Sequence, residues 1–181
     1  EEHPMYWDAN NDLWCVSRYD DIVNLAKQPN LFTSTQGNVP KMPPDPSFIN
    51  LDGKAHRNRR NLISAYFTQS AIRKMEEHIL EVVDSLIDEV IEVGHCDFVE
   101  DIAAPLPVHL IGAMTGIPPE NYDDVRHWMD VFVLGGNGPE YVTMEVNEAF
   151  INFGGLHMEM VDERRANPKD DLLSIWVHAE I

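Results

Sequence analysis

Apolar residues recur at three- and four-residue steps over most of the chain beyond position 52, which is the period of an α-helix with one buried face. The clearest of these helices is predicted to begin near Thr68 and to be closed by Gly94. Because such a stripe packs against a core, the sequence predicts a mainly α-helical fold. The stripe consists of Ile72, Met75, Ile79, Val82, Val83, Leu86, Ile87 and Val90.

Start and stop signals predict the helices that follow. They cover residues 105–114, residues 118–132, a long segment from Pro139 and a last pattern from Asp170. Gly116 is expected to end the first of them. Gly154-Gly155 is expected to interrupt the long one, because glycine disfavours a helix interior.

The first fifty residues have a different character. Two β-prone runs, residues 5–7 and 13–16, flank a polar turn and predict a small hairpin. Ser17 with Asp20 has the spacing of a capping box, so a short helix is expected to start there and to end before Pro29. Residues 33–50 contain Pro40, Pro43, Pro44 and Pro46 and no period, which predicts a long ordered loop or a mobile lid.

Composition limits the possible partners. The chain has 181 residues, 44% of them apolar, and is interpreted as a single partial domain over residues 1–181 with no internal boundary. Its formal net charge of −18 repels polyanions, so nucleic acid and anionic membrane surfaces are not expected as partners.

Two cysteines, Cys15 and Cys96, have neither the spacing of a zinc site nor that of a disulfide framework, so no metal ligands are assigned and a reducing cytoplasm is expected. No run of eighteen apolar residues is present to anchor the chain in a membrane. The chain opens at Glu1 without Met and closes at Ile181 inside a helical pattern, so both ends are predicted to be cut.

One segment reverses the charge of this acidic chain. Four basic residues lie within seven positions: Lys54, Arg57, Arg59 and Arg60. If Asp52 caps a helix here, His56 and Arg60 lie one turn apart on one face, about 6 Å along the axis. Such a pair could hold two carboxylates side by side. The alternative from spacing alone is a solvated or locally salt-bridged helix face.

The order of the motifs favours the first interpretation. Asp-x-x-x-His-x-x-x-Arg over residues 52–60, followed by Phe67-Thr68, resembles the C-helix signature of soluble bacterial cytochromes P450. Other segments are similar to that family in the same order and cover nearly all of the chain. They are residues 14–23 (first strands and B helix), 31–34 (the segment that ends it), 97–120 (E-helix region) and 170–174 (start of the H helix).

The resemblance implies the N-terminal part of the cytochrome P450 fold, mainly α with a small β-sheet, and haem (heme b) as cofactor. It assigns His56 and Arg60 to the haem propionates. It assigns no catalytic residue to this chain, because the family's thiolate cysteine is expected beyond Ile181. Cys15 and Cys96 are interpreted as ordinary buried or loop cysteines, and the chain alone is expected to be an inactive fragment of a monooxygenase.

The resemblance also implies partners. An acidic ferredoxin would bind the basic patch, for which a solvated helix face is the alternative; the patch consists of Lys54, Arg57, Arg59, Arg73 and Lys74. A small apolar substrate, with a lean toward steroid- or terpenoid-like compounds, would be lined by Val39, Met42, Pro43, Phe48, Val133 and Leu134. Plain packing is the alternative for each of these six residues.

A second function remains open. The chain would then be a non-enzymatic acidic helical module that binds a protein partner or an apolar ligand without iron. In that case residues 40–46 would be a polyproline docking segment.

Overall fold

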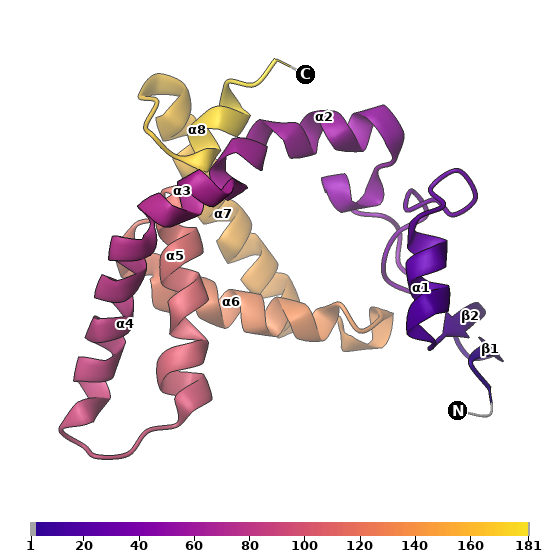
Figure 1. The fold of residues 1–181 in the computed structure, drawn as a ribbon, viewed down its shortest axis with the longest axis horizontal. Coiled ribbons are helices and arrows are strands. Elements are labelled where there is room, and N and C mark those ends of the chain that lie inside the picture. The colour runs from indigo at the N-terminus through magenta and orange to yellow at the C-terminus, as the bar shows by residue number, and fades with distance from the viewer. Residues whose placement is uncertain (1–2, 181) are drawn as a thin grey trace. The chain divides into compact units, whose positions relative to one another are not determined.

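The computed structural model describes residues 3–180, so the chain ends at Glu1 and Ile181 used in the interpretation above lie outside the described residues. Two compact units make up the structure (Figure 1). The first unit comprises Glu1–Arg60 and Gly135–Val142, and the second comprises Asn61–Leu134 and Thr143–Ile181. Each unit is described by itself below.

A hairpin opens the first unit, as predicted. Strand β1 (Met5–Asp8) pairs antiparallel with β2 (Leu13–Val16), and Met5 lies opposite Val16. The Asp8 carboxylate accepts hydrogen bonds from the backbone N–H groups of Asn10 and Asn11, which closes the turn. The predicted mainly α fold with a small β-sheet is thereby confirmed.

Helix α1 (Tyr19–Ala26) ends before Pro29, as predicted, but its predicted cap is wrong. The N-cap is Arg18, and no side chain caps the helix. The hydroxyl and the N–H of Ser17 both donate to the Pro4 carbonyl at 3.3 and 2.9 Å, so Ser17 closes the hairpin instead. The rest of the first unit contains the short 3-10 turns η1 (Phe48–Asn50) and η5 (Pro139–Tyr141) and the first part of α2 (Gly53–Ser64).

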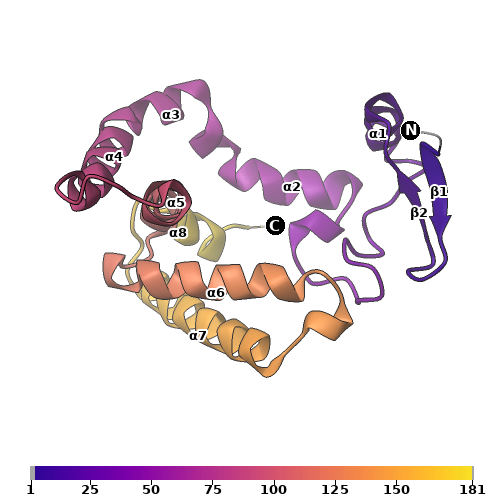
Figure 2. The same cartoon turned by 90° about the horizontal axis from the view of Figure 1, so that it is seen from below.

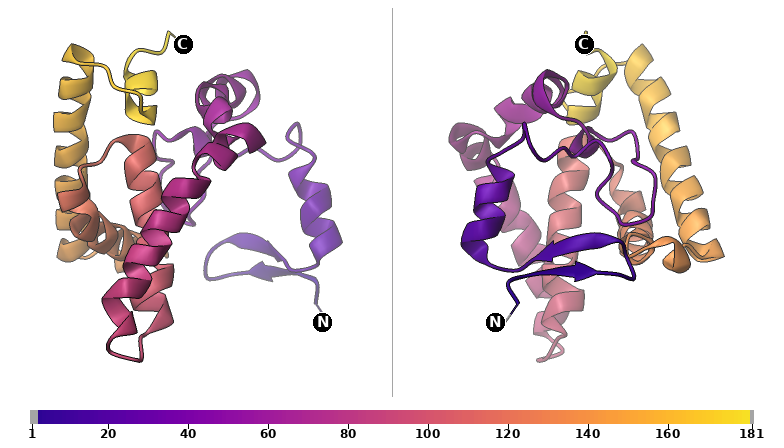
Figure 3. Two further views of the ribbon diagram at one scale, coloured as in Figure 1. Left: turned by 60° about the vertical axis from the view of Figure 1, so that its left-hand side comes forward. Right: turned by 90° about the vertical axis from the view of Figure 1, so that its right-hand side faces the viewer.

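Helices make up the second unit. They are the end of α2, η2 (Ala65–Phe67), α3 (Gln69–Lys74), α4 (Glu76–Ile91), the π-helix η3 (Phe98–Ala103), α5 (Pro105–Thr115), η4 (Pro119–Asn121), α6 (Tyr122–Gly135), α7 (Met144–Ala166) and α8 (Leu172–Val177). Helix α7 packs against α6 (Figure 2), where Val131 lies against Val146 and Ala149. Helix α4 packs against α5 (Figure 3).

The core of the second unit joins α6, α7 and α8. Its buried residues are Ile117, Val125, Met160 and Leu173, with Trp128, Phe153 and Leu156 packed against them. Gly116 ends α5 in the left-handed conformation at φ 80°, which confirms the predicted stop. Glycine is needed there for a second reason, since a Cβ would collide with the Asp171 carboxylate.

Two of the predicted helices differ from the structure in detail. The helix predicted to run unbroken from Thr68 is divided at Met75 into α3 and α4, although Thr68 does cap it by accepting from the Ala71 N–H. The predicted break at Gly154-Gly155 is absent, because α7 continues through both glycines. The long helix also starts at Met144 with Thr143 as its cap, since Pro139 opens only the separate turn η5.

Across residues 3–180, no helix has the length and apolar character needed to cross a lipid bilayer.

Candidate functional site

Helix α2 carries the densest group of positive charges in the chain. Its sequence GKAHRNRRNLIS contains four Lys and Arg residues and no carboxylate, in a chain of net charge −18. The helix starts at Gly53, whose φ of 57° only glycine adopts readily. The first helical hydrogen bond runs from the His56 N–H to the Asp52 carbonyl at 3.3 Å. Gly53 and this hydrogen bond fix where α2 begins, and therefore the direction in which its basic side chains emerge.

His56 and Arg60 lie one helical turn apart on α2, and both belong to the first unit. The ring of His56 is half-buried and lies 6.0 Å from the ring of Phe48, at an interplanar angle of 31°. Arg60 is exposed. Within the described part of the chain, neither side chain donates a hydrogen bond or pairs with a carboxylate, so their N–H donors are available to a ligand.

The other cations of α2 are also uncompensated. Ion pairs among residues 3–180 use cations elsewhere in the chain, and none uses Lys54, Arg57 or Arg59. The pairing cations are Arg18, Arg126, Arg164, Arg165 and Lys169, with His78. A helix with five unpaired donors and no acid suits a ligand with two adjacent carboxylates, since the planar fork of Arg60 and the imidazole of His56 can each donate to one.

Asp52 does not use its carboxylate on the helix that follows it. The Thr33 hydroxyl donates to it, and the Ser34 N–H donates to the same oxygen at 3.1 Å. The hydrogen bond from Thr33, followed by that from Ser34, lowers the pKa of Asp52 from its ordinary value of 3.8. Asp52 is therefore ionised near neutral pH, one turn before His56.

The predicted substrate residues fall in two places. Val39, Met42, Pro43 and Phe48 lie in the loop of residues 33–50 in the first unit, and of these Val39, Met42 and Phe48 are half-buried. Val133 and Leu134 lie near the end of α6 in the second unit and are 72% and 60% exposed. The six residues are thus divided between the two units, four in the loop and two on α6.

The predicted basic patch is divided in the same way. Lys54, Arg57 and Arg59 stand together on α2, in the first unit. Arg73 and Lys74 form the last turn of α3, in the second unit. Lys54 and Arg57, three residues apart, share one face of α2, whereas Arg59 points to another side of the helix. Arg73 and Lys74 are a separate basic helix end.

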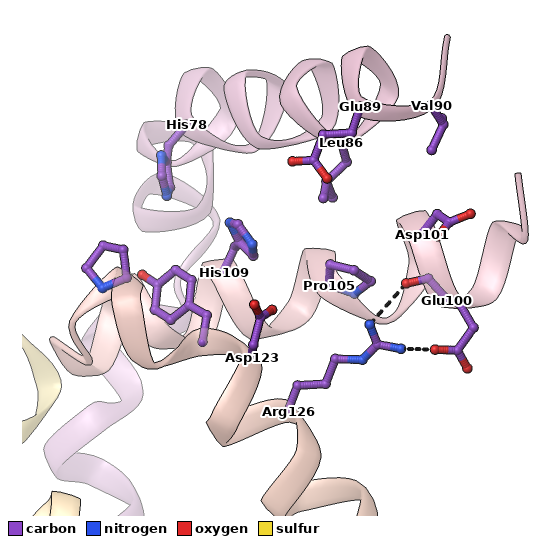
Figure 4. A pocket seen from close by; sticks show the side chains of 12 residues that line it. His78, Leu86, Glu89, Val90, Glu100, Asp101, Pro105, His109, Asp123 and Arg126 are labelled. Carbon is purple, nitrogen blue, oxygen red and sulfur yellow. Dashed lines mark hydrogen bonds and ion pairs between the residues drawn. The ribbon is translucent and has the colours of Figure 1, made fainter. Parts of the chain in front are cut away.

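A cavity of about 740 Å³ in the second unit was not expected from the sequence (Figure 4). Side chains from α4, η3, α5 and α6 line it, among them His78, Glu89, Asp101, His109 and Asp123. Arg126 spans one side and donates to the carboxylate and the carbonyl of Glu100. No spacing signal could have identified this cavity, because its lining comes from four separate segments.

Metal-binding groups are scarce. No cluster of three His, Cys, Asp or Glu residues within residues 3–180 could hold a metal ion. Cys15 is half-buried in β2 and Cys96 is exposed between α4 and η3, and both are free thiols.

No protein-family model matches the chain. Over 180 residues the chain is 37% identical to a steroid C26-monooxygenase of Mycobacterium tuberculosis, a match that covers 98% of this chain and 48% of that protein. It is 32% identical over 187 residues to a cytochrome P450 of Bacillus spizizenii, covering 99% of this chain and 44% of that protein. The chain thus spans about half the length of the curated relatives it matches.

Solved structures agree with these matches. A Mycobacterium marinum cytochrome P450 in complex with pseudoionone is similar with a TM-score of 0.86 and 29% identity, over 99% of this chain and 49% of the other. A Bacillus megaterium cytochrome P450 in complex with testosterone gives a TM-score of 0.82 and 27% identity, over 97% of this chain and 47% of the other. The shared fold covers one half of each.

Proposed function

Because the chain belongs to the cytochrome P450 family and matches the N-terminal half of its members, we propose that it forms the propionate-binding half of a haem-thiolate monooxygenase. One observation carries the proposal: α2 holds His56 and Arg60 one turn apart, unpaired within residues 3–180, on a helix without acids. This donor set fits the two carboxylates of haem b.

The residues of this chain would hold the edge of the cofactor. Arg60 offers two parallel N–H donors to one propionate, and His56 offers a ring N–H to the other. The Phe48 ring beside His56 limits the orientations of the imidazole. When bound, haem would supply oxygen activation at its iron, through a cysteine thiolate that this chain does not contribute. The chain alone is therefore proposed to be inactive.

An apolar substrate follows from the loop and from the relatives. The half-buried side chains of Val39, Met42 and Phe48 are apolar, and Pro43 adjoins them. One curated relative is named a steroid C26-monooxygenase, and two similar structures contain testosterone and pseudoionone. We propose a steroid- or terpenoid-like substrate that binds against these loop residues. Two free thiols are compatible with the reducing cytoplasm as the site of action.

The reaction class is tested by haem titration followed by a CO-difference spectrum, on the chain joined to the C-terminal half of the Mycobacterium tuberculosis relative. A thiolate-type Soret shift is expected for the joined protein, because that half supplies the missing ligand. The chain alone, as control, is expected to give no thiolate spectrum. Absence of haem uptake by the folded joined protein would instead support the alternative, a non-enzymatic acidic module that binds a partner or an apolar ligand.

An acidic ferredoxin is proposed as electron donor, because Lys54, Arg57 and Arg59 focus positive potential on one helix of an acidic chain. Changing all three to Glu in the joined protein is expected to slow electron transfer from ferredoxin by about 10- to 100-fold at low salt, with a smaller loss at high salt. Stopped-flow spectroscopy measures this rate of reduction by ferredoxin.

In the matched control, Arg18, Lys27 and Arg165 are changed to Glu instead. This variant is expected to keep the rate of electron transfer within about twofold of the wild-type rate. Equal slowing by both triple variants would show a general charge effect and would remove α2 as the docking face.

A further inference from the structure

Residues 33–50 form a loop, the lid loop, whose first residues are held by the side chain of Asp52. The hydroxyl of Thr33 donates to the carboxylate of Asp52, which lies nineteen residues later. The Ser34 N–H donates to the same carboxylate at 3.1 and 3.3 Å to its two oxygens. The first residues of the lid loop are thus fastened directly to the residue that precedes α2.

Two further hydrogen bonds hold the middle and the last part of the lid loop. The Lys41 ammonium donates to the carbonyl of Asn10 in the hairpin turn. The Asn50 amide donates to the Asp45 carbonyl at 3.2 Å, and Asn50 is only 4% exposed. A compact loop with its ends held is frequently a functional element, and here the start of the loop is bound by a charged group instead of a packed side chain.

Asp52 also touches the helix that carries the proposed haem donors. Its carbonyl accepts the His56 N–H at 3.3 Å, and Phe48, near the end of the lid loop, lies against the His56 ring. Asp52 therefore connects the start of the lid loop to the first turn of α2, and Phe48 brings the end of the loop to the same turn.

We propose that Asp52 is a latch, a positioning residue that holds the lid loop closed on α2 through Thr33 and Ser34, and that loss of the latch weakens substrate binding. The hydrogen bonds are charge-assisted, since the carboxylate is ionised near neutral pH. An unlatched loop populates open conformations, and the apparent affinity for substrate falls with the closed fraction. The latch itself stands without haem; its consequence for substrate rests on the proposed function.

Trypsin provides a test of the latch on the chain alone, because Lys41 is the one Lys or Arg between Lys27 and Lys54. Asp52→Ala is expected to speed cleavage after Lys41 by about tenfold, since a protease cuts a segment in proportion to its open population. Thr33→Val should accelerate cleavage as well, and Thr33→Ser, which keeps the hydroxyl donor, should restore the wild-type rate.

The control is Asp97→Ala, because Asp97 likewise accepts backbone N–H groups, from Val99 and Glu100, but belongs to the second unit. This variant should leave cleavage after Lys41 unchanged. Circular dichroism confirms that the helices of each variant are intact. Wild-type cleavage rates in both Asp52→Ala and Thr33→Val would overturn the latch, whatever the outcome for haem.

The effect of the latch on substrate binding is measured in the joined protein, with testosterone as the probe. Asp52→Ala and Thr33→Val are expected to raise the dissociation constant from the spectral titration by about tenfold, while the rate of haem loss stays at the wild-type value. Faster haem loss without a change in testosterone affinity would contradict a latch on the substrate side. Because trypsin cleavage needs no haem, a failure of the proposed function and a failure of the latch give different results.

Discussion

Replacing Arg164 with alanine is expected to destabilise the chain by about 3–5 kcal/mol, the loss typical of a buried ion pair that keeps one partner. Arg164 is 2% exposed on α7, and its Nε donates to the Asp171 carboxylate at 2.6 Å. A second guanidinium nitrogen donates to the Gly116 carbonyl at 3.0 Å. The side chain thus joins the ends of α5 and α7 to the start of α8.

The partner of Arg164 is equally enclosed. Asp171 is 4% exposed and caps α8 by accepting the Ser174 N–H at 2.7 Å. Burial raises the pKa of the Asp171 carboxyl, but the hydrogen bonds from Ser174 and Arg164 outweigh burial and hold the pKa below its ordinary value of 3.8. Removing Arg164 would leave this charge buried without its cation.

Urea unfolding followed by circular dichroism measures the effect. Arg165→Ala is the matched control: its pair with Asp162, at 3.1 Å, is exposed and contributes about 0.2–1 kcal/mol or less. Asp171→Asn keeps an acceptor for Ser174 but removes the ion pair, and should approach the loss in Arg164→Ala. Equal free energies of unfolding for Arg164→Ala and Arg165→Ala would contradict this account.

Acid unfolding gives a second readout of the same pair. Because the pKa of Asp171 is lowered on folding, the stabilisation is present above about pH 4 and is lost as the pH falls through the folded value. Asp171→Asn should lose less stability than the wild type over that range.

The sequence predicted elements whose signals are local. The hairpin follows from two β-prone runs around a polar turn, and the stop of α5 follows from Gly116. The position of His56 and Arg60 on one helix also follows from spacing alone. Ordered motifs then predicted the family, and the comparisons confirm it.

The wrong predictions concern positions where tertiary packing, and not the local sequence, determines whether a helix continues. Two glycines in α7 disfavour the helix by about 1 kcal/mol each. The helix nevertheless continues through both of them, because Phe153, Leu156 and Met160 on either side pack into the core. The break at Met75 keeps the apolar period in register, so periodicity cannot detect it.

Polar contacts between distant residues were also beyond the sequence. Arg164 and Asp171 meet because the chain reverses between α7 and α8, and nothing in the spacing indicates a buried pair. Asp52 was expected at most to cap a helix, yet its carboxylate binds residues eighteen and nineteen positions earlier.

Because we propose that His56 and Arg60 hold the haem propionates, their combined replacement by alanine should have a large effect on haem retention. A hydrogen bond to a charged group contributes about 1.5–3 kcal/mol, so losing two is expected to speed haem loss by about 100-fold or more. The single variants should each show a smaller acceleration. Within the described residues, the substitutions remove only the ring contact of Phe48 with His56 and the electrostatic attraction between His56 and Asp52.

The most direct measurement is the rate of haem transfer from the joined protein to excess apomyoglobin. Asn58→Ala, a neutral exposed position on the same helix, is the control and should leave the rate within about twofold. Much faster transfer from His56→Ala with Arg60→Ala, with α2 still helical, is the predicted result. A wild-type transfer rate in the double variant would contradict the assignment of α2 as the propionate-binding helix.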